Sequence, residues 1–261
     1  MRKRITLMLI GLASLSFCIG IAYELHVVRE TGLQQFNRLP SFVNDTNGST
    51  EYEIDPKTIL MSLEKGEQEI FNPIIATPEV YTPLVAGSFL WTQSDYLKIA
   101  SALGQIKWKE DLNDWYLFGM YFEKECGDNP KGFDSGSIIY FKAYNNGEIT
   151  DYLHYQTETI AIYPLFKNVV LGGDYIPRPL FGWTSISLNS LKVTADNALQ
   201  IAEENGGREA RLKVKNVCNI AIFTSPNLYG KNNWEVRYSP ASFDIYIDSY
   251  SGKYKVIDTN K

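Results

Sequence analysis

The side chains best suited to acid–base or nucleophilic chemistry are scarce in this chain of 261 residues. It has two histidines, His26 just after an apolar run and His154 in a predicted strand. No HExxH motif is present, which excludes a zinc protease of that type, and no GxSxG motif marks a nucleophilic serine. We therefore expect no catalytic residue, no cofactor and no metal ligand in this chain.

Carboxylates are the other candidates for chemistry, and six of them crowd one stretch. They are Asp111, Asp114, Glu123, Glu125, Asp128 and Asp134. Paired carboxylates with separated pKa values can hydrolyse glycosidic bonds, so this stretch carries one alternative, a hydrolase that uses acidic residues. The segment 128–136 also offers oxygen ligands and glycines, but without the spacing of a calcium-binding EF-hand loop. We interpret the stretch as a solvated acidic surface.

Three cysteines are present, and Cys18 lies in the apolar N-terminal segment. Outside the cytoplasm the other two, Cys126 and Cys218, could form one disulfide. They could equally be two unpaired buried thiols, because cysteine also behaves as a small apolar residue. The absence of a CxxC motif gives no support to a redox or zinc-ribbon role.

An aromatic segment with two prolines, 175–183 (YIPRPLFGW), is predicted to be a loop, because proline removes backbone donors. Tyr175, Arg178, Phe181 and Trp183 are our candidate contacts for a protein partner, since Trp, Tyr and Arg dominate the energetics of interfaces. The alternative is a loop packed over a sheet.

The N-terminus predicts the location of the rest of the chain. The basic residues 2–4 precede an uncharged run over 5–23, close to the ~20 residues that cross a bilayer core. Positive charge before the run and Glu24 after it favour an extracytoplasmic C-terminal part. The run is either a retained single-pass anchor in the cell membrane or a cleaved signal peptide of a secreted protein, with Gly20 and Ala22 before the cut.

The composition of the chain excludes one class of partner, nucleic acid. The net charge is −5 and no basic run follows residue 4, so the chain lacks the basic surface that nucleic acid requires. With 44% hydrophobic residues it has enough apolar surface for a globular core.

Start and stop signals predict the elements in outline. Helices are expected after Asp55, after the capping box Thr92–Asp95 with a stop at Gly104, and after Thr194 with a stop at Gly206. Strands are expected at 115–122, 137–144, 211–224, 234–238, 242–250 and 253–257. Gly147 aligned on Gly252 gives the same order of helix, Trp-led strand, strand, glycine turn and strand twice, through an internal duplication or by chance.

The downstream copy of this order resembles a PepSY-type domain, a family of peptidase propeptides and extracytoplasmic proteins. The resemblance rests on the helix 193–203 (VTADNALQIAE), the strand 234–238 (WEVRY), the strand 243–248 (FDIYID) and the turn 251–253 (SGK). It implies a helix packed on an antiparallel sheet, no catalytic residues, and binding or restraint of proteases.

The expected fold class is α+β, with two helix-on-antiparallel-sheet (PepSY- or cystatin-like) units after the N-terminal helix. The predicted organisation is an anchor or signal at 1–23, a stalk at 24–50, an upstream unit at 51–152 (a degenerate PepSY-like copy from about 92), a connector at 153–190 and a downstream unit at 191–261. The function expected is a protein-interaction module of the cell envelope that restrains or regulates a protease. The alternatives are a structural accessory subunit of a membrane complex and the acidic-residue hydrolase.

Overall fold

The computed structural model describes residues 49–66, 74–75, 89–108, 116–143, 154–177, 186–224 and 232–258. The predicted anchor at 5–23 and most of the stalk lie outside these residues. Within the described part of the chain, no helix is long and apolar enough to cross a membrane.

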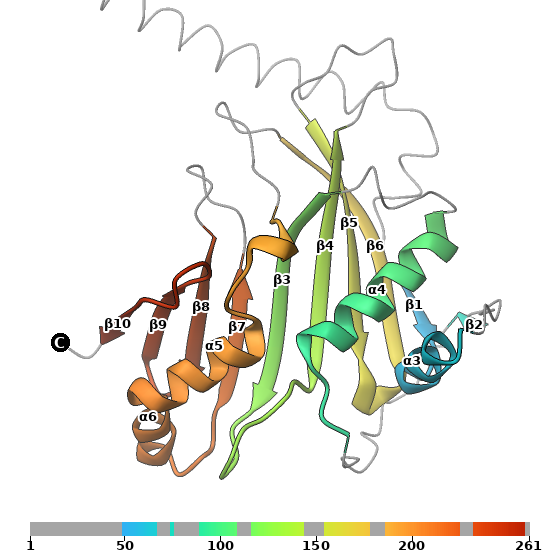
Figure 1. Ribbon diagram of the computed structural model, residues 1–261. Coiled ribbons are helices and arrows are strands. Elements are labelled where there is room, and N and C mark those ends of the chain that lie inside the picture. Colours follow the sequence, from blue (N-terminus) through green and yellow to red (C-terminus); the bar gives the residue numbers. More distant parts are fainter. Residues whose placement is uncertain are drawn as a thin grey trace, which may run out of the picture.

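One antiparallel sheet of ten strands forms the body of the molecule (Figure 1). The strands are β1 (Ser49–Glu53), β2 (Ile74–Ile75), β3 (Tyr116–Glu125), β4 (Ser135–Ala143), β5 (His154–Tyr163), β6 (Asn168–Pro177), β7 (Asn219–Thr224), β8 (Asn233–Ser239), β9 (Phe243–Asp248) and β10 (Tyr254–Asp258). Their order across the sheet is β10-β9-β8-β7-β3-β4-β5-β6-β1-β2.

The helices that pack on the sheet, α4 and α5, lie on the same face of it (Figure 1). The helical segments are α3 (Pro56–Glu64), α4 (Gln93–Trp108), η2 (Pro164–Phe166), η3 (Leu188–Ser190), α5 (Ala195–Ala202), the π turn η4 (Glu203–Gly207) and α6 (Arg208–Lys213). The helix α3 packs against α4 rather than on the sheet centre. Helices on an antiparallel sheet are the α+β class that the sequence predicts.

Each predicted helix start is confirmed by its cap. The Asp55 carboxylate accepts from the Lys57 N–H at 3.0 Å. The Thr92 N–H donates to the Asp95 carboxylate at 2.9 Å and the Asp95 N–H donates to the Thr92 hydroxyl at 3.4 Å, the reciprocal pair of a capping box. Before α5, the Thr194 hydroxyl accepts from the Asn197 N–H at 3.2 Å.

The topology contains the same arrangement twice, a helix followed by a four-stranded meander. The upstream unit consists of α4 and β3–β6, and the downstream unit of α5, η4, α6 and β7–β10. The first strands of the two meanders, β3 and β7, pair with each other in the middle of the sheet. The two units therefore share one uninterrupted sheet.

This arrangement corrects two predictions. The segment 153–190, expected to be a connector, contains the ten-residue strands β5 and β6. The alignment of Gly147 on Gly252 matches each upstream strand with the wrong downstream strand, one position too far along the chain. The reason is that the downstream unit has an additional strand, β7, between its helices and the strand of Trp234. Since Gly147 itself lies outside the described residues, the comparison rests on the order of the strands.

Two predicted boundaries are also wrong. The helix α4 continues past Gly104 to Trp108, because a glycine ends a helix only where it adopts the left-handed conformation, and Gly104 does not. Gly206 does adopt it, with φ of 114°, but the chain resumes as α6 after a kink. The predicted strand 211–224 is consequently helical at its start, and only its last six residues form β7.

An apolar row crosses the sheet on the helix-covered face and forms the centre of the core. In order of neighbouring strands it consists of Tyr52, Val169, Ile162, Gly136, Phe122, Ile222, Val236, Ile245 and Val256. Its members are buried along the row, apart from the last, Val256, which is 38% exposed. Continuous apolar burial along this row joins the two units into one core.

Two aromatic residues of β8 fix the downstream helix to the sheet. The indole N–H of Trp234, which is fully buried, donates to the Val193 carbonyl at 2.8 Å. The Tyr238 hydroxyl donates to the Glu203 carboxylate at 2.9 Å. The predicted inward alternation of Trp234, Val236 and Tyr238 is confirmed, and each buried polar group on these rings finds a partner.

Candidate functional site

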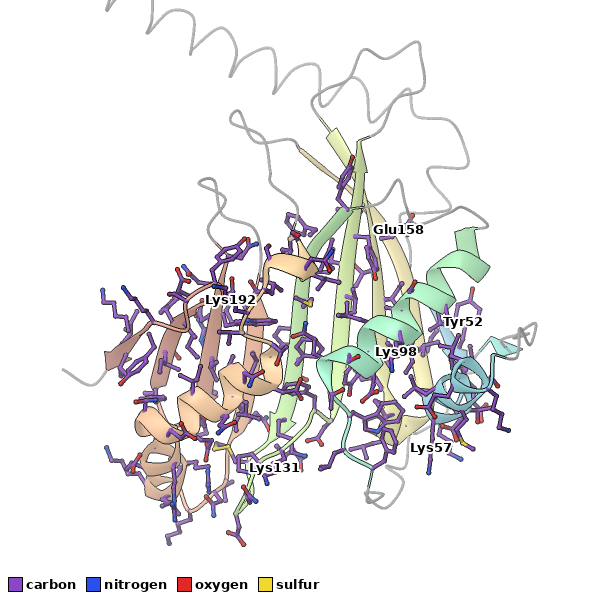
Figure 2. All side chains as sticks on the ribbon, viewed as in Figure 1. Tyr52, Lys57, Lys98, Lys131, Glu158 and Lys192 are labelled. Carbon is purple, nitrogen blue, oxygen red and sulfur yellow. A yellow bond between two sulfur atoms is a disulfide. The ribbon has the colours of Figure 1, made fainter. Side chains whose placement is uncertain are left out.

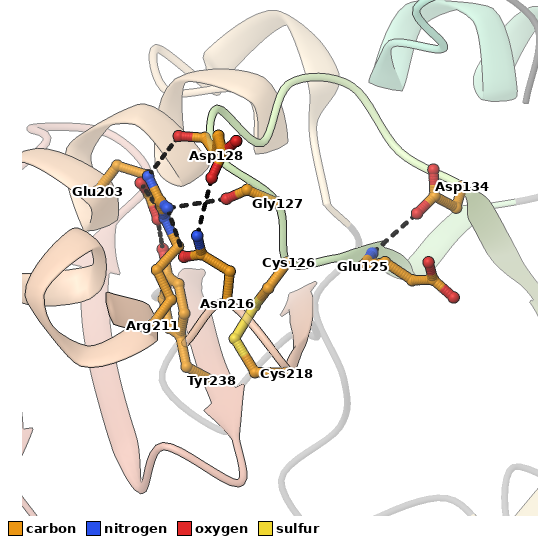
Figure 3. Close-up of a disulfide and its surroundings, with 10 residues drawn as sticks. All are labelled: Glu125, Cys126, Gly127, Asp128, Asp134, Glu203, Arg211, Asn216, Cys218 and Tyr238. Carbon is orange, nitrogen blue, oxygen red and sulfur yellow. Dashed lines mark hydrogen bonds and ion pairs between the residues drawn. A yellow bond between two sulfur atoms is a disulfide. The ribbon is translucent and has the colours of Figure 1, made fainter. Parts of the chain in front are cut away.

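A disulfide marks the junction between the two units. Cys126 comes directly after β3 and Cys218 directly before β7, next to the last residue pair of these strands, Glu125 and Asn219. The Cys126 N–H donates to the Cys218 carbonyl at 2.8 Å. Of the two alternatives that the sequence leaves open, the structure has the disulfide (Figure 3). Since the cysteines are 92 residues apart in sequence, the bond ties the end of β3 in one unit to the start of β7 in the other.

A buried arginine on α6 holds the loop between β3 and β4 against the downstream unit (Figure 3). Arg211, 3% exposed, donates from Nε to the Glu203 carboxylate at 2.8 Å. Its other nitrogens donate to the carbonyls of Gly127 at 2.8 Å and Asp128 at 3.0 Å, and to the Asn216 side chain at 2.8 Å. A guanidinium with this many partners fixes the relative position of all of them.

Glu203 links this cluster to the sheet, because it also accepts the hydrogen bond of Tyr238. Burial, and then the charge and hydrogen bond of Glu203, raise the pKa of Tyr238 well above its usual value. Tyr238 therefore stays a neutral donor, and Glu203 accepts hydrogen bonds from both Arg211 and Tyr238.

The N-termini of α4 and α5 also meet at the junction and cap each other. The Gln93 side-chain oxygen accepts from the Ala195 N–H at 2.6 Å, and the Asp196 carboxylate accepts from the Gln93 N–H at 3.1 Å. Burial raises the pKa of Asp196, and the nearby charge of Asp95 adds to the rise, while the Gln93 N–H opposes it. Each helix thus satisfies a backbone donor at the start of the other.

A groove of about 800 Å³ lies between the β3–β4 loop and the outer side of α5, η4 and α6. Its charged lining includes Asp128, Lys131, Asp196, Glu203, Arg208 and Arg211. Three of the carboxylates have structural partners, since Asp128 accepts from Asn216, Asp196 from Gln93 and Glu203 from Arg211. Through these contacts the carboxylates connect the β3–β4 loop and the helices that line the groove.

In the predicted acidic stretch, Asp134 and Glu123 likewise have hydrogen-bond partners within the structure. The Asp134 carboxylate accepts from Lys124 at 2.7 Å and from the Glu125 N–H at 2.8 Å, which closes the β3–β4 loop. The Glu123 carboxylate accepts from Tyr121 and Ser135. Asp111 and Asp114 lie outside the described residues. Among the residues that the structure describes, no three His, Cys, Asp or Glu side chains are placed to hold a metal ion.

The face of the sheet opposite α4 and α5, which we call the open face, carries a second cross-strand row. In order of neighbouring strands the open-face row consists of Glu51, Val170, Ala161, Ser137, Tyr121, Phe223, Glu235, Tyr246 and Lys255. Most of these side chains are partly exposed, and Lys255 is exposed. In contrast to the apolar row, this one mixes aromatic, charged and small residues.

The centre of the open-face row lies on the boundary between the units. The rings of Tyr121 and Phe223 are 6.4 Å apart, and the Arg237 guanidinium lies 5.7 Å from the Phe223 ring. Arg237 is half exposed and pairs with Glu235 at 2.6 Å. Burial and the hydrogen bond to Glu123 raise the pKa of Tyr121 to about 12. This patch therefore combines aromatic surface with a neutral hydroxyl and an arginine.

The side chains of the four predicted contact residues lie outside the described part of the chain, so their prediction stays a prediction. Tyr175 lies in β6, where the structure describes its backbone only, and Arg178, Phe181 and Trp183 lie outside the described residues. Sequence reasoning missed the open-face row, because its neighbours come from strands far apart in sequence. The cysteine pair was the one signal that could have placed β3 beside β7.

Comparison with known proteins adds no relative. The chain matches no protein-family model, no curated protein and no solved structure.

Proposed function

We propose that the protein is an extracytoplasmic, membrane-anchored interaction module of two PepSY-like units, and that it binds another protein through the open face. The observation that carries the proposal is the open-face row, which runs across both units, with Tyr121 and Phe223 paired at their boundary and Arg237 beside the Phe223 ring. Tyrosine and arginine are among the residues that contribute most to protein interfaces.

The junction supports this use of the face. The disulfide, the Arg211 cluster and the mutual caps of α4 and α5 all connect the two units. A surface held in one shape loses little conformational freedom when a partner binds, which leaves more of the contact energy for affinity. The partly exposed strip is therefore suited to recognition of a folded protein.

Two observations support a location of this binding outside the cytoplasm. Disulfides persist in oxidising compartments and are rare in the cytosol, so the Cys126–Cys218 bond favours an extracytoplasmic location. The charge pattern around residues 5–23 predicts the same orientation. A retained anchor would hold the open face close to other envelope proteins.

The resemblance of residues 191–258 to PepSY-type domains favours an envelope or secreted protease as the partner. In this proposal the module restrains or positions the protease and performs no chemistry itself. A membrane complex without a peptidase as partner would instead make the protein an accessory subunit.

Co-purification of the tagged full-length protein from its own cells tests the proposal. Phe223→Glu places a charge in the centre of the open face, and we expect it to reduce the recovered partner at least about tenfold, as loss of an interface anchor does. Val217→Glu is the matched control, because Val217 is 74% exposed and lies between α6 and β7, outside the row. Equal recovery with both variants would refute binding through this face.

A further inference from the structure

The outer edge of β10 is an unpaired sheet edge that carries exposed apolar side chains. β10 pairs with β9 on one side and is the last strand of the sheet on the other (Figure 1). On the helix-covered face, Tyr254 is 51% and Val256 38% exposed, although Val256 continues the apolar row that is buried from Tyr52 to Ile245. Edge strands with exposed apolar side chains are sites where further strands add.

The backbone of β10 presents its free groups at these same residues. The Asp248 N–H donates to the Lys253 carbonyl at 2.8 Å, which makes these two a hydrogen-bonded pair. In an antiparallel ladder such pairs alternate, so Lys255 and Ile257 also bond to β9. The N–H and C=O groups of Tyr254 and Val256 consequently point away from the sheet.

The upstream unit shows what covers the equivalent edge there. Its fourth strand, β6, pairs on its outer side with β1, which runs antiparallel to it. β1 extends the apolar row by Tyr52, which is only 9% exposed and lies beside α3 (Figure 2). On the open face β1 contributes Glu51 and Glu53. In the described residues of the downstream unit, no strand takes the place of β1 beside β10.

We infer that β10 binds an extended segment of a partner protein as an added antiparallel strand, and that this segment alternates apolar and acidic residues. The inference rests on the proposed function and specifies one contact of it. The apolar residues would cover Tyr254 and Val256 and complete the apolar row. The acidic residues would face Lys253 and Lys255, which are both exposed on the open-face side of β10.

The segment 49–55 of this chain (STEYEID) has the required pattern and serves as a probe. Set antiparallel with Tyr52 opposite Val256, it places Ile54 opposite Tyr254. The same register puts Glu53 opposite Lys255 and Asp55 opposite Lys253. Main-chain hydrogen bonds supply affinity in this mode of binding, and the alternating side chains supply specificity.

Fluorescence anisotropy of a labelled STEYEID peptide, titrated with the purified full-length protein in detergent, tests the inference. Val256→Pro removes an outward N–H but no bond to β9, and edge strands tolerate proline at such positions. We expect it to weaken peptide binding about tenfold or more. Val256→Thr keeps the N–H and is expected to bind nearly as the unaltered protein does.

Exchange of charges gives a second measurement that a change in stability would not mimic. The Lys253→Glu, Lys255→Glu double variant should bind the acidic peptide more weakly. It should prefer a peptide in which the three acidic residues of STEYEID are lysines. Absence of peptide binding, or binding unaffected by Val256→Pro, would overturn the inference. A dimer detected by light scattering that Val256→Pro dissociates would also overturn it, because β10 would then pair with a second copy of this chain. These results need no cellular partner, so failure here leaves the co-purification test of the open face independent.

Discussion

At the scale of single residues, the core contains positions whose surroundings allow little change. Gly136 is a clear case, since it stands in the apolar row where Tyr96 and Phe122 fill the space above the sheet. A Cβ built there would lie 2.7 Å from the Tyr96 ring and 2.9 Å from the Phe122 ring. The Tyr96 hydroxyl is itself fixed, because it donates to the Phe133 carbonyl at 3.1 Å.

Gly136→Ala should therefore destabilise the protein by about 2 kcal/mol, the usual cost of overpacking a core. Chemical denaturation followed by tryptophan fluorescence measures the change. Gly127→Ala is the control, because nothing lies within 4 Å of a Cβ at that position. A loss for Gly136→Ala no larger than for Gly127→Ala would show that the rings can move aside.

The disulfide at the junction is a second feature at this scale. Replacement of Cys126 and Cys218 by serine removes a crosslink between residues 92 apart, which should lower the free energy of unfolding by about 4 kcal/mol. Part of this effect lies in the unfolded chain, whose freedom the crosslink restricts. The same variant and the unaltered protein should therefore unfold at similar denaturant concentrations once a reductant is added. A difference that persists under reduction would point to lost packing instead.

At the scale of elements, the starts of α4 and α5 connect the two units through their mutual caps. Burial where the two helices meet raises the pKa of Asp196, and the nearby charge of Asp95 adds to the rise. The folded state consequently holds this proton to higher pH than the unfolded chain does. As the pH rises above 3.8, the ordinary pKa of an aspartate, the unfolded chain releases this proton more readily than the folded state does. The contribution of Asp196 to the free energy of unfolding therefore falls.

Asp196→Asn should remove this dependence. We expect the free energy of unfolding of the variant, relative to the unaltered protein, to increase as the pH is raised from about 3 to about 7. Denaturant titrations across this range measure the difference. Asp128→Asn is a suitable comparison, since it changes a carboxylate that lines the same groove but lies outside the helix contact. A difference for Asp196→Asn that declines with pH would contradict the assigned sign.

Elements were predictable from the sequence where their signals are local. The caps at Asp55, Thr92 and Thr194 and the alternation around Trp234 depend on residues a few positions apart, and the structure has each of them. The order of the strands was not predictable in this way, because it depends on the pairing of β3 with β7. The continuation through Gly206 into α6 carries Arg211, two of whose partners, Gly127 and Asp128, lie more than 80 residues away in sequence.

At the scale of the whole molecule, one sheet with helices on a single face has two different surfaces. The apolar row makes the core and the open-face row remains partly exposed, although both run through the same strands. The sequence alternation predicts that one face of each strand is buried. It cannot show that the opposite faces of β3, β7, β8 and β9 combine into one strip, since that needs the register of all four strands.

The cellular location of the whole molecule can be tested through the oxidation state of its cysteines. Cells treated with acid, to trap thiols, and then with a maleimide should show Cys126 and Cys218 protected until a reductant is added. Cys18 is the one thiol expected to react if the N-terminal segment is retained. Mass spectrometry of the labelled peptides resolves the three positions. Free Cys126 and Cys218 in cells would contradict an extracytoplasmic location.

Site-specific photo-crosslinking in intact cells tests the central claim most directly. A photoreactive residue in place of Tyr121 or Phe223 should capture one and the same protein from both positions. The same residue in place of Val217 should not capture it. A common product whose yield falls with Arg237→Glu would agree with binding through the open face. Capture of that protein with equal yield from Val217, or no captured protein from either open-face position, would contradict it.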